Sequence, residues 1–590
     1  MKQATFTSTA RSLALATLLA LVFPMTASAQ AGDRIQVPGD FATIQAAIDG
    51  AGDGQTIEVG PGIYNETLFV NKSLTLVAAA GPGLTLVHAG GASTAISIGT
   101  VEGDFDPDTG IHPDFVRIEG FHVLGWSERG IAQRLGSGTV EIIGNQLTAT
   151  EGDTRSAIVI SGGDDSRIEG NVILGTSFGE SGLSSSGILT VGAMAASVRN
   201  NEVSGTDIGI ALAAGFGQTD PSWAESAVID LADNDIQATE VGIGIFGPVK
   251  DASLVGNHIA NVTTRGITIE DFDGSGEFAE RLSIINNQII EFGTRAYTSS
   301  LRPVTGLELR DNLISSNSLN SWGFEIGTGT SDVLVSGNEI NIAGVAIFLR
   351  PLTDALIEDN DLNGQIAAMG ISSAGHADNL IRENRIRGGI IFQDQANIDG
   401  YTVTANQLLS TPGTFPLGIN VAINADSSAG PLAATCNWWE DPSGPSLTAG
   451  GQGTSVSEHV NFEPWKTAPE GSCDGEAAFA SSIAAASATI LSITPDTHVP
   501  SQSLPTVLVL DQYGNPFANV QVSFELQAST GSIGGAVQLS DSDGLAQLGS
   551  WMLGDEPTQT VIATANDLDG SPISFTVNTD AIFHDRFESE

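Results

Sequence analysis

The stretch Ile142-Ile143-Gly144-Asn145-Gln146-Leu147 decides the fold, because its pattern returns throughout the middle of the chain. It recurs as Ile168-Glu169-Gly170-Asn171-Val172-Ile173 and as Leu254-Val255-Gly256-Asn257-His258-Ile259, with apolar residues three before and two after the Asn. Phe121 occupies the same slot one repeat earlier, and Asn437 one repeat later. The recurring asparagines, 22 to 33 residues apart, are Asn145, Asn171, Asn201, Asn234, Asn257, Asn287, Asn312, Asn338, Asn360, Asn384 and Asn406.

Each repeat holds three short strand-like segments and no segment of helix length. After the Asn, most repeats continue with a Gly and alternating apolar residues, as in Gly242-Ile243-Gly244-Ile245. Such alternation turns apolar side chains to one face, and stacked coils cover one another. A leucine-rich repeat lacks support because the leucine framework is missing, and a propeller needs four strands in ~40 residues. We predict an all-β chain built on a parallel β-helix.

The recurring Asn is predicted to serve that solenoid in two ways. Asn tolerates the left-handed backbone conformation, so we expect it at a sharp bend between strands. Stacked once per coil, the side-chain amides would form a structural ladder at strand spacing.

Both ends of the repeat resemble a known family. Phe41-Ala-Thr-Ile-Gln-Ala-Ala-Ile-Asp49 and the following Gly54–Glu66 are similar to the opening of right-handed parallel β-helix proteins of the pectin-lyase-like superfamily. Cys436-Asn-Trp-Trp-Glu-Asp-Pro-Ser-Gly-Pro445 resembles the segment that often closes such repeats, with Glu440 in place of the usual Gly. The resemblance implies a β-helix over 33–473, opened by a short capping helix for which Asp40 is the expected N-cap.

Composition and charge exclude several classes of function. The chain has 69 acidic and 22 basic residues and a net charge of −47, so nucleic acid and anionic membranes would be repelled. Its 41% hydrophobic content is enough for a core and excludes wholesale disorder. We therefore expect no nucleic-acid partner.

The N-terminus predicts export. Residues 1–29 combine Lys2 and Arg11 with an apolar run and the small-residue site Ala27-Ser28-Ala29, which is typical of a signal peptide. The run is too short for the ~20 residues of a membrane-spanning helix, and no later stretch is apolar enough to span. Export permits a disulfide between the two cysteines, Cys436 and Cys473, with two free thiols as the alternative. We expect an extracellular or cell-surface location on a bacterium.

A change of pattern after Cys473 predicts a second domain. Residues 474–489 are rich in Ala and Ser and are predicted to be a linker. Residues 490–580 show short alternating strands of Ig-like size. Asp511-Gln-Tyr-Gly-Asn-Pro516 and Val520–Phe524 resemble the bacterial Ig-like domain of the intimin/invasin type, which implies a spacer or adhesive module. Residues 581–590 are predicted to be a short tail.

The catalytic patterns that the superfamily resemblance implies are incomplete. Gly62-Ile-Tyr-Asn-Glu66 matches an element of pectin methylesterases, but it fits first-coil architecture equally well, and the later motifs are missing. Asp164-Asp165 lacks the partners that polygalacturonases carry. Trp126, Trp223 and Trp322 could stack on sugars or simply pack loops. The arginines Arg167, Arg199, Arg265, Arg295, Arg302, Arg310, Arg382, Arg385 and Arg387 look scattered, with only the last three clustered.

Acidic positions suggest calcium at two kinds of place, although no cofactor is required. Aspartates lie six residues before the repeat Asn in several coils, and those of consecutive coils would stack ~5 Å apart, so they either recruit a cation or serve as turn residues. Two acidic insertions offer alternate carboxylates, but they fail the EF-hand template and equally fit solvated loops. The candidate calcium ligands are Asp332, Asp354 and Asp378 in the column, and Asp271, Asp273, Asp104, Asp106 and Asp108 in the insertions.

The sequence favours an exported β-helix protein that engages a polysaccharide or another surface ligand without catalysis. The alternative is a polysaccharide lyase, hydrolase or esterase with a groove along one face of the solenoid. Fold alone does not choose between them, and the sequence assigns no catalytic residue.

Overall fold

The structure is a computed structural model of the 590-residue chain. It describes residues 34–579 except 100–111, 134–137, 150–155, 163–164, 176–184, 194, 215–225, 238, 271–278, 300–301, 370–374, 394–397, 411–422, 426–430, 448–450, 477–478 and 494–497. The predicted signal peptide and tail lie outside these residues.

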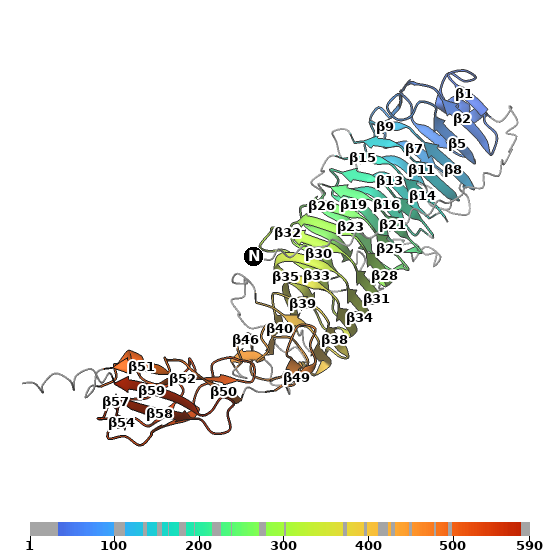
Figure 1. The fold of residues 1–590 in the computed structure, drawn as a ribbon. Helices are drawn as coiled ribbons and strands as arrows, with labels where there is room; N and C mark the ends of the chain where they lie inside the picture. Colours follow the sequence, from blue (N-terminus) through green and yellow to red (C-terminus); the bar gives the residue numbers. More distant parts are fainter. Residues whose placement is uncertain are drawn as a thin grey trace, which may run out of the picture.

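Stacked coils form a long solenoid, whose strands run across it in columns (Figure 1). The first column is a 19-stranded sheet. Its strands are β1 Arg34–Val37, β2 Gln55–Val59, β5 Leu74–Ala78, β8 Phe115–Glu119, β11 Thr139–Ile143, β14 Arg167–Glu169, β17 Ser197–Arg199, β20 Ser226–Ala227, β21 Asp230–Ala232, β24 Val249–Lys250, β25 Ser253–Val255, β28 Ala279–Ile285, β31 Val304–Arg310, β34 Ser331–Ser336, β36 Thr353–Glu358, β38 Asn379–Arg382, β41 Tyr401–Thr404, β44 Leu432–Ala433 and β47 Val460–Asn461.

A 28-stranded sheet holds two further columns, which β35 and β37 join by running through both. The column after the repeat Asn contains β3 Gly62–Tyr64, β6 Thr85–His88, β9 His122–Leu124, β12 Gln146–Thr148, β15 Val172–Leu174, β18 Glu202–Ser204, β22 Asp235–Gln237, β26 His258–Val262, β29 Gln288–Phe292, β32 Leu313–Ser316, β35 Glu339–Leu349, β37 Asp361–Met369, β39 Arg385–Ile386 and β42 Gln407–Leu408. The last column contains β4 Leu68–Val70, β7 Thr94–Ile98, β10 Arg129–Gln133, β13 Ser156–Ser161, β16 Ser186–Val191, β19 Ile208–Ala213, β23 Val241–Phe246, β27 Arg265–Glu270, β30 Arg295–Thr298, β33 Trp322–Ile326, β40 Ile390–Gln393, β43 Ile423–Ala425, β45 Pro445–Leu447 and β46 Gly453–Val456.

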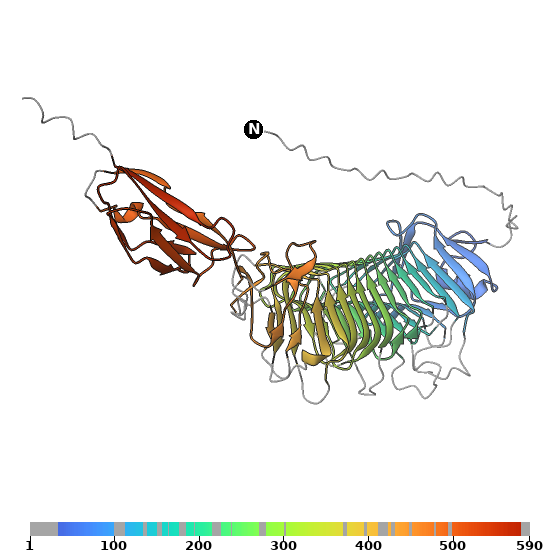
Figure 2. The ribbon, with the colours of Figure 1, turned by 60° about the horizontal axis from the view of Figure 1, so that its bottom comes forward.

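Successive coils pair strand on strand in parallel, so the predicted parallel β-helix is confirmed. Ile142 of β11, for example, lies opposite Ile168 of β14. Inward side chains from Val37 to Trp465 form one continuous buried cluster. Figure 2 shows the stacked coils that contribute these side chains. Each coil therefore covers the apolar surface of its neighbours, and no coil is stable alone.

The repeat asparagines form a buried hydrogen-bonded ladder. Asn171 Oδ1 accepts the backbone N–H of Asn145 at 2.9 Å and its side-chain amide at 3.1 Å. The same two bonds link each later asparagine to the next, from Asn171 through Asn406 to Asn437. Phe121, which has no amide, begins the ladder by donating its backbone N–H to Asn145 Oδ1.

The bend conformation belongs to the residue before each ladder Asn, which corrects the expectation that Asn itself adopts it. The residues at this position have φ between +55° and +68°; they are Gly144, Gly170, Asn200, Asp233, Gly256, Asn286, Asp311, Gly337, Asp359, Glu383, Ala405 and Cys436. The left-handed residue turns the chain, and this frees the following Asn to point its amide inward. The ladder Asn is therefore selected for its hydrogen bonds.

A short helix closes the N-terminal end of the solenoid. Helix α1, Ile44–Gly50, buries Ile44 and Ile48 against the first coils. Its N-cap is Thr43, which accepts from Ala46 N–H at 3.1 Å, so the expectation of Asp40 was wrong. Asp40 instead accepts from Gln36 N–H in the preceding turn.

Glu66 also serves this helix. Its carboxylate accepts the Ile44 and Gln45 backbone N–H groups at 2.9 and 3.0 Å, where the helix has no internal acceptor. The Gly-x-Tyr-x-Glu element therefore has an architectural role in the first coil.

The aromatic segment at the other end closes the last coils. Trp438 and Trp439 are buried, and Glu440 takes φ +71° where the similar family segment has Gly. The predicted disulfide between Cys436 and Cys473 is confirmed, with a Cα–Cα distance of 5.0 Å. It ties β49 (Cys473–Gly475), which pairs with β48 (Trp465–Lys466), to the end of the Asn ladder.

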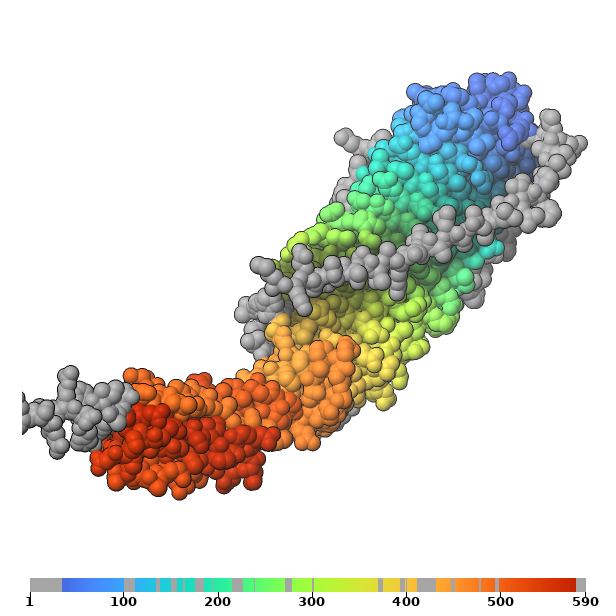
Figure 3. All heavy atoms as spheres, in the orientation of Figure 1, coloured from blue at the N-terminus to red at the C-terminus, as the bar shows by residue number. Residues whose placement is uncertain are grey.

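A separate C-terminal unit has its own core, which runs from Ile483 to Val577. Figure 3 shows it at the end of the stacked coils. One sheet contains β50 Ala480–Ala485, β52 Thr506–Asp511 and β56 Leu545–Gln547. A second contains β51 Ile490–Ile493, β53 Gln521–Leu526, β55 Val537–Leu539, β58 Thr558–Thr564 and β59 Ile573–Thr579, and a two-stranded sheet contains β54 Ser532–Gly534 and β57 Ser550–Met552.

Part of the predicted linker is structured. Residues 480–485 form β50, which pairs antiparallel with β52, and Ile483 is buried in the second core. The surrounding small residues concealed this strand in the sequence, because only one large apolar side chain anchors it. Tyr513 links the two units, since its hydroxyl bonds the Glu476 backbone and its ring lies 6.3 Å from that of Trp465.

Candidate functional site

The candidate site lies on the outer face of the last column, across five neighbouring coils. Arg265, Arg295, Trp322, Val345 and Gln365 occupy the same register position on β27, β30, β33, β35 and β37. A second row on the same strands places Thr268, Thr298, Glu325, Phe348 and Ala367 in register. The site is therefore assembled by stacking, from residues about one coil apart in sequence.

Strand alternation explains why the side chains of the second row face outward. Ile267, Tyr297 and Phe324, which are fully buried, point into the solenoid core. Their neighbours Thr268, Thr298 and Glu325 must then lie on the opposite face, because successive side chains of a strand alternate.

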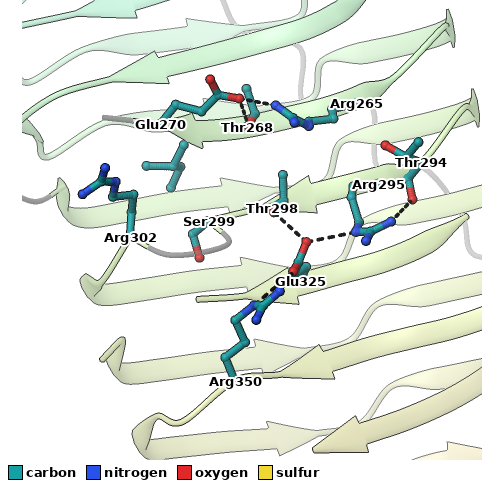
Figure 4. Close-up of a pocket in the computed structure, with 11 residues that line it drawn as sticks. Arg265, Thr268, Glu270, Thr294, Arg295, Thr298, Ser299, Arg302, Glu325 and Arg350 are labelled. Atoms are coloured by element: carbon teal, nitrogen blue, oxygen red, sulfur yellow. Dashed lines mark hydrogen bonds and ion pairs between the residues drawn. The ribbon is translucent and has the colours of Figure 1, made fainter. Parts of the chain in front are cut away.

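An open depression of about 580 Å³ occupies this face (Figure 4). Its lining is mostly polar and carries four arginines and two glutamates. The described residues that line it are Arg265, Thr268, Ile269, Glu270, Thr294, Arg295, Thr298, Ser299, Arg302, Glu325 and Arg350.

Glu325 is held at the floor of the depression by two arginines. Arg295 Nε donates to its Oε2 at 2.9 Å, and Arg350 Nη2 donates to its Oε1 at 2.6 Å. Thr298 Oγ1 donates to Oε2 at 2.9 Å, and only 6% of the Glu325 side chain is exposed. Figure 4 shows the carboxylate between the two guanidinium groups.

The ionised form of Glu325 is the stable one. Burial by itself raises the pKa of a carboxyl, but the hydrogen bonds from Arg350, Arg295 and Thr298 outweigh it, so the pKa of Glu325 lies below its ordinary value. Both carboxylate oxygens are already accepting bonds. Glu325 is thus poorly suited to donate or take a proton near neutral pH.

An aromatic pair braces the two arginines. The Arg295 guanidinium lies 3.6 Å from the centroid of the Trp322 ring, and Trp322 stacks on Phe348 with ring centroids 4.5 Å apart. Arg350 lies over the Phe348 ring at 5.4 Å. Together with Glu325 these contacts close a ring of five side chains, which fixes both guanidinium groups in place.

Glu270 is the second carboxylate of the depression and is also paired. It forms an ion pair with Arg265 and accepts from Thr268 Oγ1 at 3.1 Å. Glu270 lies on β27 and Glu325 on β33, with β30 between them (Figure 4).

A second hollow of about 400 Å³ adjoins the depression and shares Arg295 with it. Its described lining is less polar and consists of Arg295, Leu319, Asn320, Trp322, Gly344, Val345, Phe348, Gln365, Ala367 and Met369. Gln365 is 1% exposed, and its Nε2 has no hydrogen-bond partner in the described part of the chain.

The depression is cationic on a strongly acidic protein. Four arginines face two glutamates among its lining residues, whereas the whole chain carries a net charge of −47. At physiological salt, charges farther away than about 8 Å are largely screened, so the local excess decides which ligands approach. The net charge, from which nucleic acid and anionic membranes are expected to be repelled, therefore does not describe the charge of this face.

The aspartates of the predicted calcium column are stacked and share one backbone conformation. Asp332 and Asp354 are stacked on consecutive coils, since their flanking residues pair in register, and Asp378 follows beside the Thr353–Ala377 bridge. All three have φ between +55° and +56°. The same position holds Ala195, Val228 and Arg281 in other coils, also with positive φ, so the position demands a bend and not a carboxylate.

No group of three or more His, Cys, Asp or Glu side chains in the described part of the chain is placed to hold a metal ion. Asp251, which also lies six residues before its ladder asparagine, Asn257, is paired with Arg281. The insertion candidates Asp271, Asp273, Asp104, Asp106 and Asp108 lie outside the described residues. Calcium binding at the column therefore stays a prediction.

The arginine cluster was missed at the level of sequence. In the sequence Arg265, Arg295 and Arg302 are scattered and nothing groups Arg350 with them, but the coils bring all four together. Arg265 and Arg295 each lie eight residues after their ladder Asn, a shared offset that could have revealed the stack. Arg382, Arg385 and Arg387, which had looked clustered, pair with Glu358 and Asp361 instead.

The three tryptophans that could stack on sugars lie in different surroundings. Trp126 is buried in the solenoid core, and Trp223 lies outside the described residues. Trp322 is at the site, but Arg295 and Phe348 lie against its ring. It acts as a brace within the site.

Fold and site together define a parallel β-helix protein with a lateral, arginine-lined depression. The sequence profile of the family described as "Periplasmic copper-binding protein (NosD)" matches residues 222–418, about a third of the chain. No curated protein matches the chain.

Solved structures are similar in fold at low sequence identity. The mannuronan C-5 epimerase AlgE6 A-module of Azotobacter vinelandii is 13% identical over 63% of this chain and 95% of its own, with a TM-score of 0.38. The family 28 exopolygalacturonase of Yersinia enterocolitica is 12% identical over 62% and 76%, with a TM-score of 0.35. The tailspike of Pseudomonas phage phi297 is 11% identical over 87% and 88%, with a TM-score of 0.36.

None of the helices in the described ranges is long and apolar enough to cross a membrane.

Proposed function

We propose that this protein is exported and binds an anionic polysaccharide along the outer face of β27, β30, β33 and β35 without cleaving it. The observation that carries the proposal is the arginine-lined depression, in which Glu325 fixes Arg295 and Arg350. Guanidinium groups held in a fixed geometry match carboxylate and sulfate oxygens. An open depression on a rod-like solenoid suits a chain that extends beyond the site.

The arginines retain donors for such a ligand. Arg295 uses Nε on Glu325 and Nη1 on the Thr294 carbonyl, and Arg350 uses Nε and Nη2 on Glu325. Nη2 of Arg295 and Nη1 of Arg350 have no partner among the described residues. A ligand anion could therefore bind them without breaking the bonds to Glu325.

The chemistry of the lining favours binding over cleavage. Glycoside hydrolysis needs one carboxyl that is protonated near neutral pH and a second that acts as base or nucleophile. Glu325 has a lowered pKa and Glu270 is paired with Arg265, and the described lining contains no His, Tyr or Lys. A polysaccharide lyase, hydrolase or esterase is the alternative.

Export and the C-terminal unit complete the proposal. The signal-like residues 1–29, the Cys436–Cys473 disulfide and the periplasmic description of the partly matching family support a location outside the cytoplasm. We propose that the C-terminal unit is an Ig-like domain of the intimin/invasin type, acting as a spacer or adhesive module. Its two main sheets around one core support this.

The test is a binding assay of the exported form against acidic and neutral polysaccharides at two salt concentrations. Arg265→Gln should weaken binding of acidic chains about tenfold, and added salt should weaken it further. Arg385→Gln on β39 is the matched control, because it removes the same charge from an ion pair outside the depression. Equal effects of the two substitutions would contradict the site.

The same samples decide whether any bond is broken. Release of reducing ends and of unsaturated products is followed over hours at pH 5 to 8. We expect no release above the no-protein control. Turnover of any polysaccharide that is lost in Glu325→Gln would establish the enzyme alternative.

A further inference from the structure

The hollow beside the depression contains an unsatisfied amide that the binding of an anion does not explain. Gln365 on β37 lines it and is 1% exposed, yet its Nε2 has no partner among the residues that the structure describes. Burying a polar group without a hydrogen bond is unfavourable, and a buried orphan in a native structure calls for a function. A primary amide offers a donor and an acceptor side by side.

The walls around Gln365 are mainly apolar. Phe348, Val345 and Ala367 are buried, whereas Leu319 is 74% exposed at the rim beside Asn320. Trp322 turns only the edge of its ring to the hollow, because Arg295 and Phe348 lie against the ring. An apolar wall with one amide fits an uncharged sugar ring, whose C–H groups pack on the wall while neighbouring hydroxyls pair with the amide.

A second charged sugar fits this hollow poorly. The cation among its described lining residues is Arg295, whose Nε and Nη1 are already bonded and whose remaining donor, Nη2, serves the anion subsite in the depression. A carboxylate placed against Phe348 and Val345 would lose its water without gaining a partner. The hollow thus selects against the repeating charge of a homopolymer of uronic acids.

We propose that the hollow is a neutral-sugar subsite next to the anion subsite, and that Gln365 determines specificity there. The inference rests on the proposed function and sharpens it. The ligand is an acidic heteropolysaccharide in which a charged sugar is followed by an uncharged one. Arg295, which belongs to both lining sets, lies at the junction of the two units.

The experiment compares three probes: hyaluronan, in which glucuronate alternates with an uncharged amino sugar, polygalacturonate, in which every unit is charged, and neutral dextran. The protein should bind hyaluronan at least tenfold more tightly than polygalacturonate, and dextran least. Gln365→Leu should weaken hyaluronan binding about three- to tenfold, the loss expected for one or two neutral hydrogen bonds, and leave polygalacturonate within twofold.

Two further variants keep the test decisive. Gln288→Leu on β29 is the matched control, because this Gln is exposed on the same sheet, away from both lining sets. Met369→Trp should fill the hollow and reproduce the selective loss without touching the amide. Melting temperatures of all variants are measured, so that a loss of binding is compared among folded proteins.

The outcomes separate the two proposals. Equal affinity for hyaluronan and polygalacturonate, with no effect of Gln365→Leu or Met369→Trp, overturns the neutral subsite and leaves the anion site standing. Failure to bind either polyanion, or binding of dextran alone, overturns the proposed function and the subsite with it.

Discussion

Asn312 Oδ1 accepts two hydrogen bonds from Asn287, one from its backbone N–H at 2.9 Å and one from its side-chain amide at 3.0 Å. Both residues are at most 1% exposed. Each ladder Asn therefore satisfies two buried donors of the coil before it, and the solenoid depends on an unbroken column of amides.

Replacing one amide should destabilise the solenoid strongly. In Asn312→Ala, both Asn287 donors lose their acceptor in a buried place, at a cost of about 1–3 kcal/mol each. Chemical denaturation should show a loss of about 3 kcal/mol or more. Asn363→Ala, at an exposed Asn on β37, is the control and should change stability by less than about 0.5 kcal/mol. Equal losses in the two variants would mean that the ladder does not carry stability.

The Asp column should respond to backbone conformation. Asp354 has φ +56°, so Asp354→Asn and Asp354→Gly should keep the melting temperature, while β-branched Asp354→Val should lower it because its side chain resists φ > 0. The comparison is made with and without calcium. A calcium-dependent rise in melting temperature that Asp354→Asn abolishes would show instead that the carboxylates hold a cation.

Glu325 should stabilise the protein in a defined range of pH. Its pKa is lowered in the folded protein, so its contribution is complete above the unfolded value of about 4.3 and is lost as the pH falls through the folded value. Glu325→Gln should cost about 3 kcal/mol at pH 7, because two arginines lose their buried partner. The variant should lose less stability than the wild type between pH 5 and pH 2. An identical slope in both proteins would contradict this role.

His376 should affect the stability of the protein in a different range of pH. Burial lowers its pKa to about 4 against an ordinary 6.5, and its Nδ1 bonds the Tyr401 hydroxyl at 2.6 Å. Because the unfolded chain binds a proton that the folded chain does not, stability should fall as the pH drops from 6.5 to 4, by up to roughly 3 kcal/mol. In His376→Gln, urea unfolding at a series of pH values should show a flatter profile there, while the Glu325 range stays unchanged.

The sequence was sufficient for features that repeat once per coil. The Asn spacing predicted the solenoid, its ladder and its parallel stacking, and the two cysteines predicted the disulfide. The sequence did not predict two local features, because each depends on a single residue. Thr43 and not Asp40 caps α1, and Ile483 alone anchors β50 within the predicted linker. The sequence did not predict the site either, since coil lengths vary and only register shows that Arg265, Arg295 and Trp322 lie side by side.

The sequence by itself therefore determined the architecture of this protein, because apolar periodicity and a recurrent Asn are local patterns that each coil repeats. Only the tertiary structure decided where the chemistry lies. Arg350, which directly follows β35, reaches Glu325 across 25 residues of sequence, and among the described residues Gln365 Nε2 is left without a partner by packing that no single coil contains. Stacking brings residues that are distant in sequence into contact. Their charges and hydrogen bonds act only at such short separations.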